Sequence, residues 1–311
     1  MIPDGVAAAA AVALDRLVGE PPARWHPVAW YGTTMARLER HIYRDARTAG
    51  ILHLAVGAGI GVAVGCGLRG LLGRPASTLV ATTIAVAGRM LADETDAVLR
   101  PLATGDLDAA RARLAGIVGR DVTRLDRASI ARAVVETVAE NTVDGVTAPL
   151  WWATVGGAPA VLAHRTINTL DAMVGHRDDR YRQFGWASAR ADDVVNWIPA
   201  RLTAAAVTAV RPRRAASIAR TVRRDAPRHP SPNGGVVEAA FAAALDVRLG
   251  GTNTYGDVVE DRGTLGNGRT PTPADGVAAI RLARDVTGAL ACAVAVGAVV
   301  MRRRHARAGR W

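Results

Sequence analysis

Apolar stretches without a charged residue alternate with polar segments along this chain. The two longest cover 51–68 and 146–163, and shorter ones cover 75–88, 202–210 and 286–301. A membrane-spanning helix needs about 20 mostly apolar residues, with a lower limit of about 17. The two longest stretches reach this range, and flanking arginines that keep their charged heads in water can extend 75–88 and 286–301. Stretch 202–210 is shorter still and is either interfacial or buried. The pattern predicts membrane-associated helices over all five stretches.

The polar segments are predicted to be mainly helical as well. Residues 89–132 mix acids and arginines at helical spacing, with Leu91, Val98 and Leu102 on one apolar stripe. Residues 250–273 are rich in Gly, Thr, Asn and Pro and are expected to form an irregular loop. No alternating strand pattern persists. The expected fold class is all-α: a polytopic integral membrane helical protein with polar amphipathic helices and loops forming the active site, in a single membrane-embedded enzyme domain, 1–311.

Composition narrows the class of partner. Half of the residues are hydrophobic but only 4% are aromatic, so small apolar side chains dominate, as suits closely packed membrane helices. The net charge is +11, and all 39 basic residues are arginine. Zinc-finger spacing and aromatic RNA-binding motifs are missing, so no nucleic acid partner is expected. Cys66 and Cys292 lie in apolar stretches and imply no disulfide framework. The acidic N-terminus does not resemble a cleaved signal peptide.

An acidic stripe precedes the stretch 146–163. Glu136, Glu140 and Asp144 are four residues apart, which places them on one face of a helix. Three such acids repel one another. A solvated acidic face is the plainer interpretation, but acids at a membrane boundary need a cation partner. Carboxylates combined with water and phosphate oxygens suit Mg²⁺, so the stripe is a candidate metal or catalytic site.

Three further polar segments carry candidate chemistry. One holds Asn168, Asp171, His176 and Arg180; the next holds Arg190, Asp192, Asp193, Asn196 and Arg201; the last reads His229-Pro-Ser231-Pro-Asn233-Gly-Gly and reaches Glu238. Arginines near acids either form plain salt bridges or bind phosphates in a two-pronged geometry. The Gly-rich turn is either a capped surface turn or an anion cradle. A P-loop, G-x-S-x-G and H-E-x-x-H are all missing.

Three runs in this order carry a resemblance to a known family. They are LDRLVGEPPARWHPV at 14–28, the run from ETVAENTVDG to IPARLTA at 136–204, and HPSPNGGVVEAAFAAALDVRLGGTNTYG at 229–256. Together they resemble the adenosylcobinamide-phosphate synthase (CobD/CbiB) family. The family turn Gly-Asp-Pro here reads Gly19-Glu20-Pro21, which keeps the charge. The resemblance implies a carbon–nitrogen ligase of cobalamin biosynthesis that joins adenosylcobyric acid to aminopropanol or its O-phosphate. ATP and Mg²⁺ would drive the reaction, and no tightly bound metal or cofactor is evident.

Roles for the candidates follow from the chemistry of amide formation. A carboxylate must be activated, phosphate charge must be neutralised, and the incoming ammonium must lose a proton. The catalytic candidates are Glu136, Glu140, Asp144, Asp171, Asp192 and Asp193. The phosphate-binding candidates are Arg180, Arg190 and Arg201. The substrate-binding candidates are Asn141, Asn168, His176, Asn196, His229, Ser231, Asn233 and Glu238. A tentative Mg²⁺ set is Glu140, Asp144 and Asp192.

Location and topology complete the expectations. The protein is expected to be a multi-pass protein of the cell membrane whose active site faces the cytoplasm. Its expected partners are membrane lipid and other enzymes of the cobalamin pathway. Stretch 146–163 contains Pro149, Gly156, Gly157 and Pro159, so we expect a bent or re-entrant helical pair there. Intramembrane acids also mark ion and substrate paths, so a corrinoid or ion transporter is the alternative. A membrane scaffold would not need so many polar residues.

Overall fold

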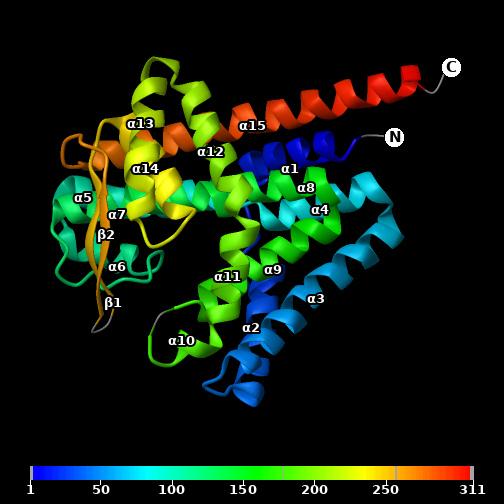
Figure 1. Cartoon of the computed structure of the whole chain (residues 1–311), viewed down its shortest axis with the longest axis horizontal. Helices are drawn as coiled ribbons and strands as arrows, with labels where there is room; N and C mark the ends of the chain where they lie inside the picture. The colour runs from blue at the N-terminus through cyan, green and yellow to red at the C-terminus, as the bar shows by residue number, and fades with distance from the viewer. Residues whose placement is uncertain (1–2, 177, 256–257, 309–311) are drawn as a thin grey trace. The chain divides into compact units, whose positions relative to one another are not determined.

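The computed structural model describes residues 3–176, 178–255 and 258–308 (Figure 1). The chain forms two compact units, each assembled from separate stretches of sequence. Unit one comprises 1–88, 144–195 and 290–311, and unit two comprises 89–143 and 196–289. That both act as one membrane-embedded domain stays a prediction.

The regular elements among the described residues of unit one are all helices or helical turns. Its elements are α1 (Asp4–Val18), η1 (Ala23–Trp25), α2 (Pro27–Ile42), α3 (Arg47–Leu72), α4 (Arg74–Ala85), the π-helical turn η2 (Val143–Thr147), α8 (Ala148–Gly156), α9 (Ala158–Val174), α10 (Tyr181–Phe184) and α11 (Trp186–Val195). Its apolar core includes Val12, Val86, Leu150 and Val161.

Unit two combines helices with one β-hairpin. Its elements are α5 (Gly88–Thr104), α6 (Leu107–Leu114), α7 (Arg127–Thr142), α12 (Trp197–Val210), η3 (Pro212–Arg214), α13 (Ala215–Asp225), η4 (Ala226–Arg228), α14 (Gly234–Leu245), β1 (Leu249–Tyr255) and β2 (Val258–Leu265). Helix α14 packs against α7, α12 and α13 and also contacts both strands. It is therefore the central element of this unit.

The mainly helical class is confirmed, since 79% of the chain is helical and sheet is almost absent. Among the described residues, three segments are long and apolar enough to cross a membrane: Arg47–Leu72, Arg74–Thr104 and Pro273–Arg304. The second includes stretch 75–88. It is not one straight helix, because α4 ends at Ala85 and Val86 adopts an extended conformation before α5 begins. Stretch 202–210 lies in α12, which is shorter than a span.

Helix α3 has one face that packs on protein and another that is exposed and apolar. Its buried face carries Gly57, Gly61 and Gly65. A Cβ at Gly61 would lie 2.7 Å from the Leu162 carbonyl oxygen, and one at Gly65 would lie 2.4 Å from Pro159 Cα. Only glycine allows α9 to approach this closely, which is the packing device of membrane helices. The exposed face includes Ile51, Leu52, Val62, Val64 and Leu71, so α3 is suited to contact lipid.

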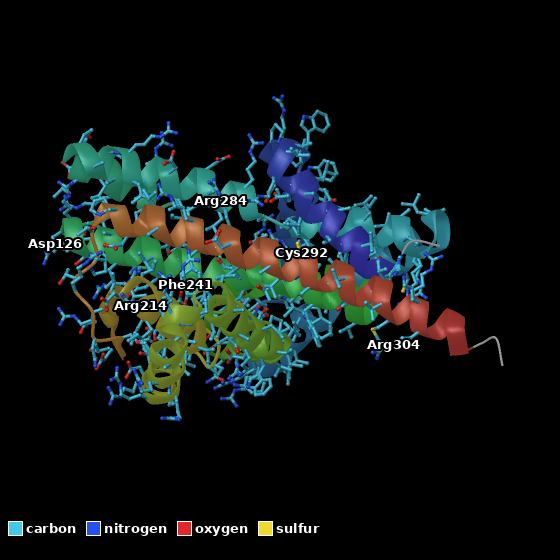
Figure 2. The ribbon with its side chains drawn as sticks, turned by 90° about the horizontal axis from the view of Figure 1, so that it is seen from above. Asp126, Arg214, Phe241, Arg284, Cys292 and Arg304 are labelled. Carbon is cyan, nitrogen blue, oxygen red and sulfur yellow. The ribbon has the colours of Figure 1, made fainter. Side chains whose placement is uncertain are left out.

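Helix α15 (Pro273–Ala308) is a single long helix that contributes to both units. Figure 2 shows it continuous from Arg284 past Cys292 to Arg304. Only 11% of its most apolar 18-residue window is buried by protein. Val296, Val299, Val300 and Met301 are exposed there. Such a surface is stable in hydrocarbon and unfavourable in water.

Stretch 146–163 is a broken pair of helices, as its prolines and glycines predict. Helix α8 ends at Gly156, and Gly157 has φ +65°, a left-handed conformation that favours glycine. Helix α9 then starts at Ala158 with Pro159 in its first turn and packs against α8. The bend is therefore encoded locally.

The prediction of an irregular loop at 250–273 was wrong for most of this segment. Strands β1 and β2 pair antiparallel, with Leu249 opposite Leu265 and Gly250 opposite Thr264, and the register shifts between Gly250 and Thr252. Leu249 and Leu265 are buried against the helices, and β1 contacts α7 while β2 contacts α13 and α14. Tertiary packing thus turns a weakly patterned segment into a hairpin.

Candidate functional site

Helix α7 positions the first two acids of the predicted stripe. It begins at the cap residue Asp126, whose side chain accepts a hydrogen bond from the Ser129 amide at 2.8 Å. Glu136 and Glu140 follow on one face, but the α-helical spacing ends at Thr142. Asp144 lies in the π-helical turn η2 and belongs to unit one. The stripe that shares regular helical geometry is therefore limited to Glu136 and Glu140.

Glu136 is a buried member of an internal ion pair. Its Oε2 lies 2.5 Å from Arg120 Nη2, and its Oε1 accepts the Gly250 amide at 2.8 Å. Arg132 Nε lies 3.8 Å from Oε1. Both oxygens are thus occupied by groups of unit two, and Glu136 ties β1 to α7.

The Gly-rich turn before α14 is shaped by Ser231. Its hydroxyl oxygen accepts the amides of Asn233 at 3.3 Å and Gly234 at 3.0 Å, which satisfies donors at the start of the helix. A Cβ at Gly234 would lie 2.9 Å from Glu140 Oε1 and 3.0 Å from His229 Cε1. Glycine at this position therefore lets α14 approach both side chains. One turn further on, α14 presents Glu238.

Glu140, His229, Glu238 and Arg262, here called the Glu–His cluster, meet within unit two. Ligand atoms of Glu140, His229 and Glu238 all lie within 4.8 Å of one another. Arg262 Nη2 donates to Glu140 Oε1 at 3.0 Å and lies 3.5 Å from Glu238 Oε1, while Arg262 Nε donates to His229 Nε2 at 2.8 Å. His229 Nε2 and Glu238 Oε1 are 3.3 Å apart. Segments far apart in the sequence thus supply one charged group.

Glu238 is the least satisfied member of the cluster. Its side chain is fully buried, and neither carboxylate oxygen accepts a hydrogen bond within the described part of the chain. A buried charge with no aligned donor is costly. Burial and the neighbouring Glu140 carboxylate accordingly raise the pKa of Glu238 to about 7. This residue can therefore take up or release a proton near neutral pH.

The surroundings of Glu140 and His229 also shift the pKa values of these two side chains. Burial disfavours ionisation of Glu140, but the Arg262 charge, a hydrogen bond from Glu238 in its protonated form and the His229 charge together lower the pKa of Glu140 below its ordinary value. Burial lowers the pKa of His229, and the Glu238 carboxylate raises it more. Because Arg262 Nε can only donate, the 2.8 Å contact requires an unprotonated His229 Nε2 in this arrangement. His229 Nδ1 lies 3.1 Å from the Ser231 amide nitrogen and 3.2 Å from the Ser231 carbonyl oxygen, so the turn holds the ring in place.

Other predicted residues of unit two hydrogen-bond to neighbouring groups, and Arg201 does so at the same turn. Arg201 Nη1 donates to Asn233 Oδ1 at 3.0 Å, and its guanidinium stacks 4.1 Å from the centre of the Trp197 ring. Asn141 Nδ2 donates to the Thr137 carbonyl at 3.0 Å. The Asn196 carbonyl accepts the Ala200 amide at the start of α12. Arg201 is therefore the predicted phosphate clamp that shares a unit with the Glu–His cluster.

The remaining predicted residues lie in unit one. Asn168 Nδ2 donates to Asp192 Oδ1 at 3.2 Å, and Arg190 pairs with Asp193 at 3.2 Å. The other contacts are Arg180 with Glu39 at 3.0 Å, His176 beside Tyr181, the Asp171 carbonyl with the Gly175 amide, and Asp144 in electrostatic contact with Arg165. The tentative Mg²⁺ set Glu140, Asp144 and Asp192 is thus divided between the units.

The site contains residues that the sequence pattern did not single out. Arg262 lies on β2, within the segment expected to be a loop, and Arg120 lies in the segment before α7. Nothing in the sequence paired Arg262 with acids so distant in the chain.

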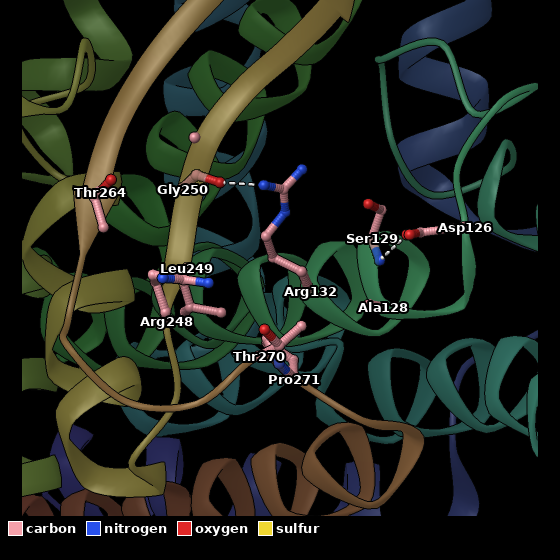
Figure 3. Close-up of a pocket in the computed structure, with 11 residues that line it drawn as sticks. Asp126, Ala128, Ser129, Arg132, Arg248, Leu249, Gly250, Thr264, Thr270 and Pro271 are labelled. Carbon is pink, nitrogen blue, oxygen red and sulfur yellow. Dashed lines mark hydrogen bonds between the residues drawn. The ribbon is translucent and has the colours of Figure 1, made fainter.

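A pocket of about 250 Å³ opens at the start of α7 (Figure 3). Arg132, Arg248, Ser129 and Thr264 are among its lining residues. Arg132 Nη1 donates to the Gly250 carbonyl, drawn as a dashed line, and Arg132 Nε is buried without a hydrogen-bond acceptor among the described residues. Gly250 also donates to Glu136, so this pocket adjoins the buried ion pair.

The phosphate-clamp hypothesis gives a direct comparison of arginines. If clamping needs the two-pronged guanidinium, Arg190→Lys, Arg180→Lys and Arg201→Lys should each raise the Michaelis constant for ATP or for the phosphorylated amine by about tenfold or more. Arg213→Lys, an exposed arginine outside all candidate sets, is the matched control. A clamp assignment fails for any position whose variant matches the control in both constants and in turnover.

Comparisons with known proteins agree with this picture. The CobD/Cbib protein family model matches residues 8–283. A cobalamin biosynthesis protein CobD of Mycobacterium tuberculosis (strain ATCC 25618 / H37Rv) is 46% identical over 296 residues, covering 93% of this chain and 94% of that protein. Proteins of the same name are 44% identical in Halalkalibacterium halodurans, covering 85% and 86%, and 43% identical in Rhodobacter capsulatus, covering 93% and 96%. No solved structure matches the chain significantly.

The fold and site define a mainly helical protein with apolar helices of spanning length and a cluster of two glutamates and a histidine. The chain belongs to the CobD/CbiB family.

Proposed function

We propose that this protein acts in cobalamin biosynthesis as an adenosylcobinamide-phosphate synthase, a carbon–nitrogen ligase. It joins adenosylcobyric acid to aminopropanol or its O-phosphate with the energy of ATP. The names of its relatives support the pathway. The observation that carries the reaction class is the Glu–His cluster, in which a buried carboxylate with a pKa of about 7 lies beside an ionised one.

Amide formation from a carboxylate and an ammonium requires two changes of charge. The propionate carboxylate of the corrinoid attacks the terminal phosphorus of ATP, and ADP leaves, so that an acyl phosphate forms. The amine then attacks the acyl carbon, inorganic phosphate leaves, and one proton passes to a base. A base is most effective when its pKa lies near the operating pH. Glu238 meets this condition.

The two carboxylates of the cluster have different proposed roles. Glu140 is the exposed member, with 35% of its side chain accessible, and it is held ionised by Arg262. It attracts the incoming ammonium group. Glu238 is fully buried, with a ligand atom within 4.8 Å of one of Glu140, so the proton passes from the amine to Glu140 and on to Glu238. Arg262 and His229 hold both acids in position.

Mg²⁺ is expected to accompany ATP, but the Glu–His cluster does not fit a resident Mg²⁺ ion as arranged. The guanidinium of Arg262 already contacts Glu140, His229 and Glu238. A divalent ion there would lie against a permanent positive charge, and imidazole is a poor Mg²⁺ ligand. We therefore derive no catalytic step from an ion at this cluster.

The proposed location is the cell membrane, with several spans and a cytoplasmic site, because ATP is cytoplasmic. The break at Gly157 supports a helical pair that folds back rather than one span between α7 and the segment after α9. On a background lacking Cys66 and Cys292, cysteines at the exposed positions Thr123 and Asp179 should both react with impermeant maleimide from the cytoplasmic side. Reaction from opposite faces would establish a crossing between them and contradict the folded-back pair.

The reaction itself is tested with purified protein in detergent. Incubation with adenosylcobyric acid, the amine, ATP and Mg²⁺ should give a corrinoid whose mass has increased by the amine less water. Omission of ATP should abolish this product. A corrinoid of unchanged mass, with uptake into vesicles instead, would support the transporter and contradict the ligase. Parallel reactions with aminopropanol and its O-phosphate identify the amine.

A further inference from the structure

A second, cationic pocket lies in unit two between α13, α14 and the turn after β2. It has a volume of about 550 Å³. Its polar lining includes Ser217, Arg220, Arg223, Arg224, Asn267 and one acid, Asp246. We infer that this pocket binds a polyphosphate chain, such as that of a nucleoside triphosphate. The inference deepens the proposed function and rests on it for the identity of the anion.

Three arginines of α13 lie on one side of the helix, and two of them have no ion pair among the described residues. Arg220, Arg223 and Arg224 follow the three- and four-residue spacing that places side chains about 5–6 Å apart on a helix. Arg220 and Arg223 are exposed and have no ion pair among the described residues. The nearby acids are already paired: Asp225 with Arg224 at 2.7 Å and Asp246 with Arg214 at 3.3 Å. Two guanidinium groups therefore remain available to an anion.

The opposite wall of the pocket is rigidly built from glycine. Gly266 has φ +81°, and a Cβ there would lie 2.7 Å from the Val247 carbonyl oxygen. A Cβ at Gly268 would lie 2.2 Å from the Asp246 carbonyl carbon. The Gly266 amide donates to Asp225 Oδ2 at 2.9 Å, and Arg224 Nη2 donates to Asn267 Oδ1 at 3.1 Å. The turn is thereby fixed against both helices, so the pocket is preorganised for a ligand.

Three elements connect this pocket to the Glu–His cluster over short distances along the chain. Glu238 and Ala242, the latter in the pocket lining, are one turn apart on α14. Arg262 on β2 precedes Gly266, just after that strand, by four residues or about 13 Å of extended chain, and His229 follows Asp225 by four residues. One helical turn rises about 5.4 Å. Along α14, the pocket lining at Ala242 therefore lies about one helical turn from Glu238.

The test is direct binding, so that it does not depend on turnover. Full-length protein in detergent is titrated calorimetrically with sodium tripolyphosphate and, separately, with inorganic phosphate. Tripolyphosphate should bind more tightly, because it can engage more than one arginine. Arg220→Gln combined with Arg223→Gln should weaken tripolyphosphate binding at least about tenfold, the least expected from losing two charge-assisted contacts. Arg213→Gln, which removes one positive charge from neighbouring η3, should leave binding unchanged.

Several results would overturn the site. They are no binding by the wild type, equal weakening in Arg213→Gln, or no weakening in the double variant. A lipid headgroup is the other source of phosphate, so the titration is repeated in nanodiscs of phosphatidylcholine and of phosphatidylglycerol. Loss of tripolyphosphate binding only in phosphatidylglycerol would assign the pocket to lipid. If the wild type makes the amide but the double variant binds tripolyphosphate as well as the wild type does, this site alone is refuted. If the wild type binds tripolyphosphate at this site but makes no amide, the proposed function alone is refuted.

Discussion

Glu238→Gln is expected to lower turnover at least about 100-fold, the scale of losing one general acid–base group. The same change should raise thermal stability at pH 8. The folded-state pKa of Glu238 is raised to about 7 by burial and Glu140, so its carboxylate form destabilises the fold. That cost is absent below the ordinary pKa of glutamate, about 4.3, and fully present above about 7. Glutamine removes the charge, so the gain in Tm over wild type should be large at pH 8 and small near pH 5.

Glu136→Gln provides the contrast for this prediction. Glu136 is also buried, but it is paired with Arg120 and accepts the Gly250 amide. Breaking such a pair leaves a buried cation and costs about 3–5 kcal/mol. Glu136→Gln should therefore lower Tm and yield at pH 8, opposite to Glu238→Gln. If thermal unfolding monitored by intrinsic tryptophan fluorescence gives both variants the same sign at pH 8, the assignment of distinct roles is wrong.

Glu140→Gln should lower turnover by at least about 100-fold while folded yield changes little. Glu140 is partly exposed, and its electrostatic interaction raises the pKa of Glu238. Removing that negative charge lowers the pKa of Glu238. The acid limb of the residual pH–rate profile, near pH 7 in the wild type, should therefore move to lower pH.

Glu94→Gln is the matched control for Glu140→Gln, because Glu94 is an exposed acid of the same unit outside the cluster. It should retain wild-type turnover and an acid limb near pH 7. Wild-type turnover in Glu140→Gln would remove Glu140 from the site. A large loss of turnover with an unmoved acid limb would instead separate Glu140 from the titration of Glu238.

The sequence predicted the helical class because hydrophobic content and the spacing of apolar residues are local properties. The break at Gly157 was equally predictable, since proline and glycine act within a few residues. Glu140, His229 and Glu238 were each proposed from their local motifs. That these three residues lie together could not be predicted, because it depends on how α7, α14 and β2 pack. Arg262 lies on a strand that forms only through tertiary contacts. The division of the tentative metal set between the units could not be predicted for the same reason.

The central claim is ATP-driven amide formation, and isotope transfer tests it most directly. Adenosylcobyric acid labelled with ¹⁸O in its free carboxylate is incubated with purified protein, the amine, ATP and Mg²⁺. Because an acyl phosphate carries one carboxylate oxygen to phosphorus, the proposal predicts one ¹⁸O in inorganic phosphate for each amide formed, together with one ADP. Amide formation with unlabelled phosphate, or ATP hydrolysis that leaves the corrinoid unchanged, would contradict it.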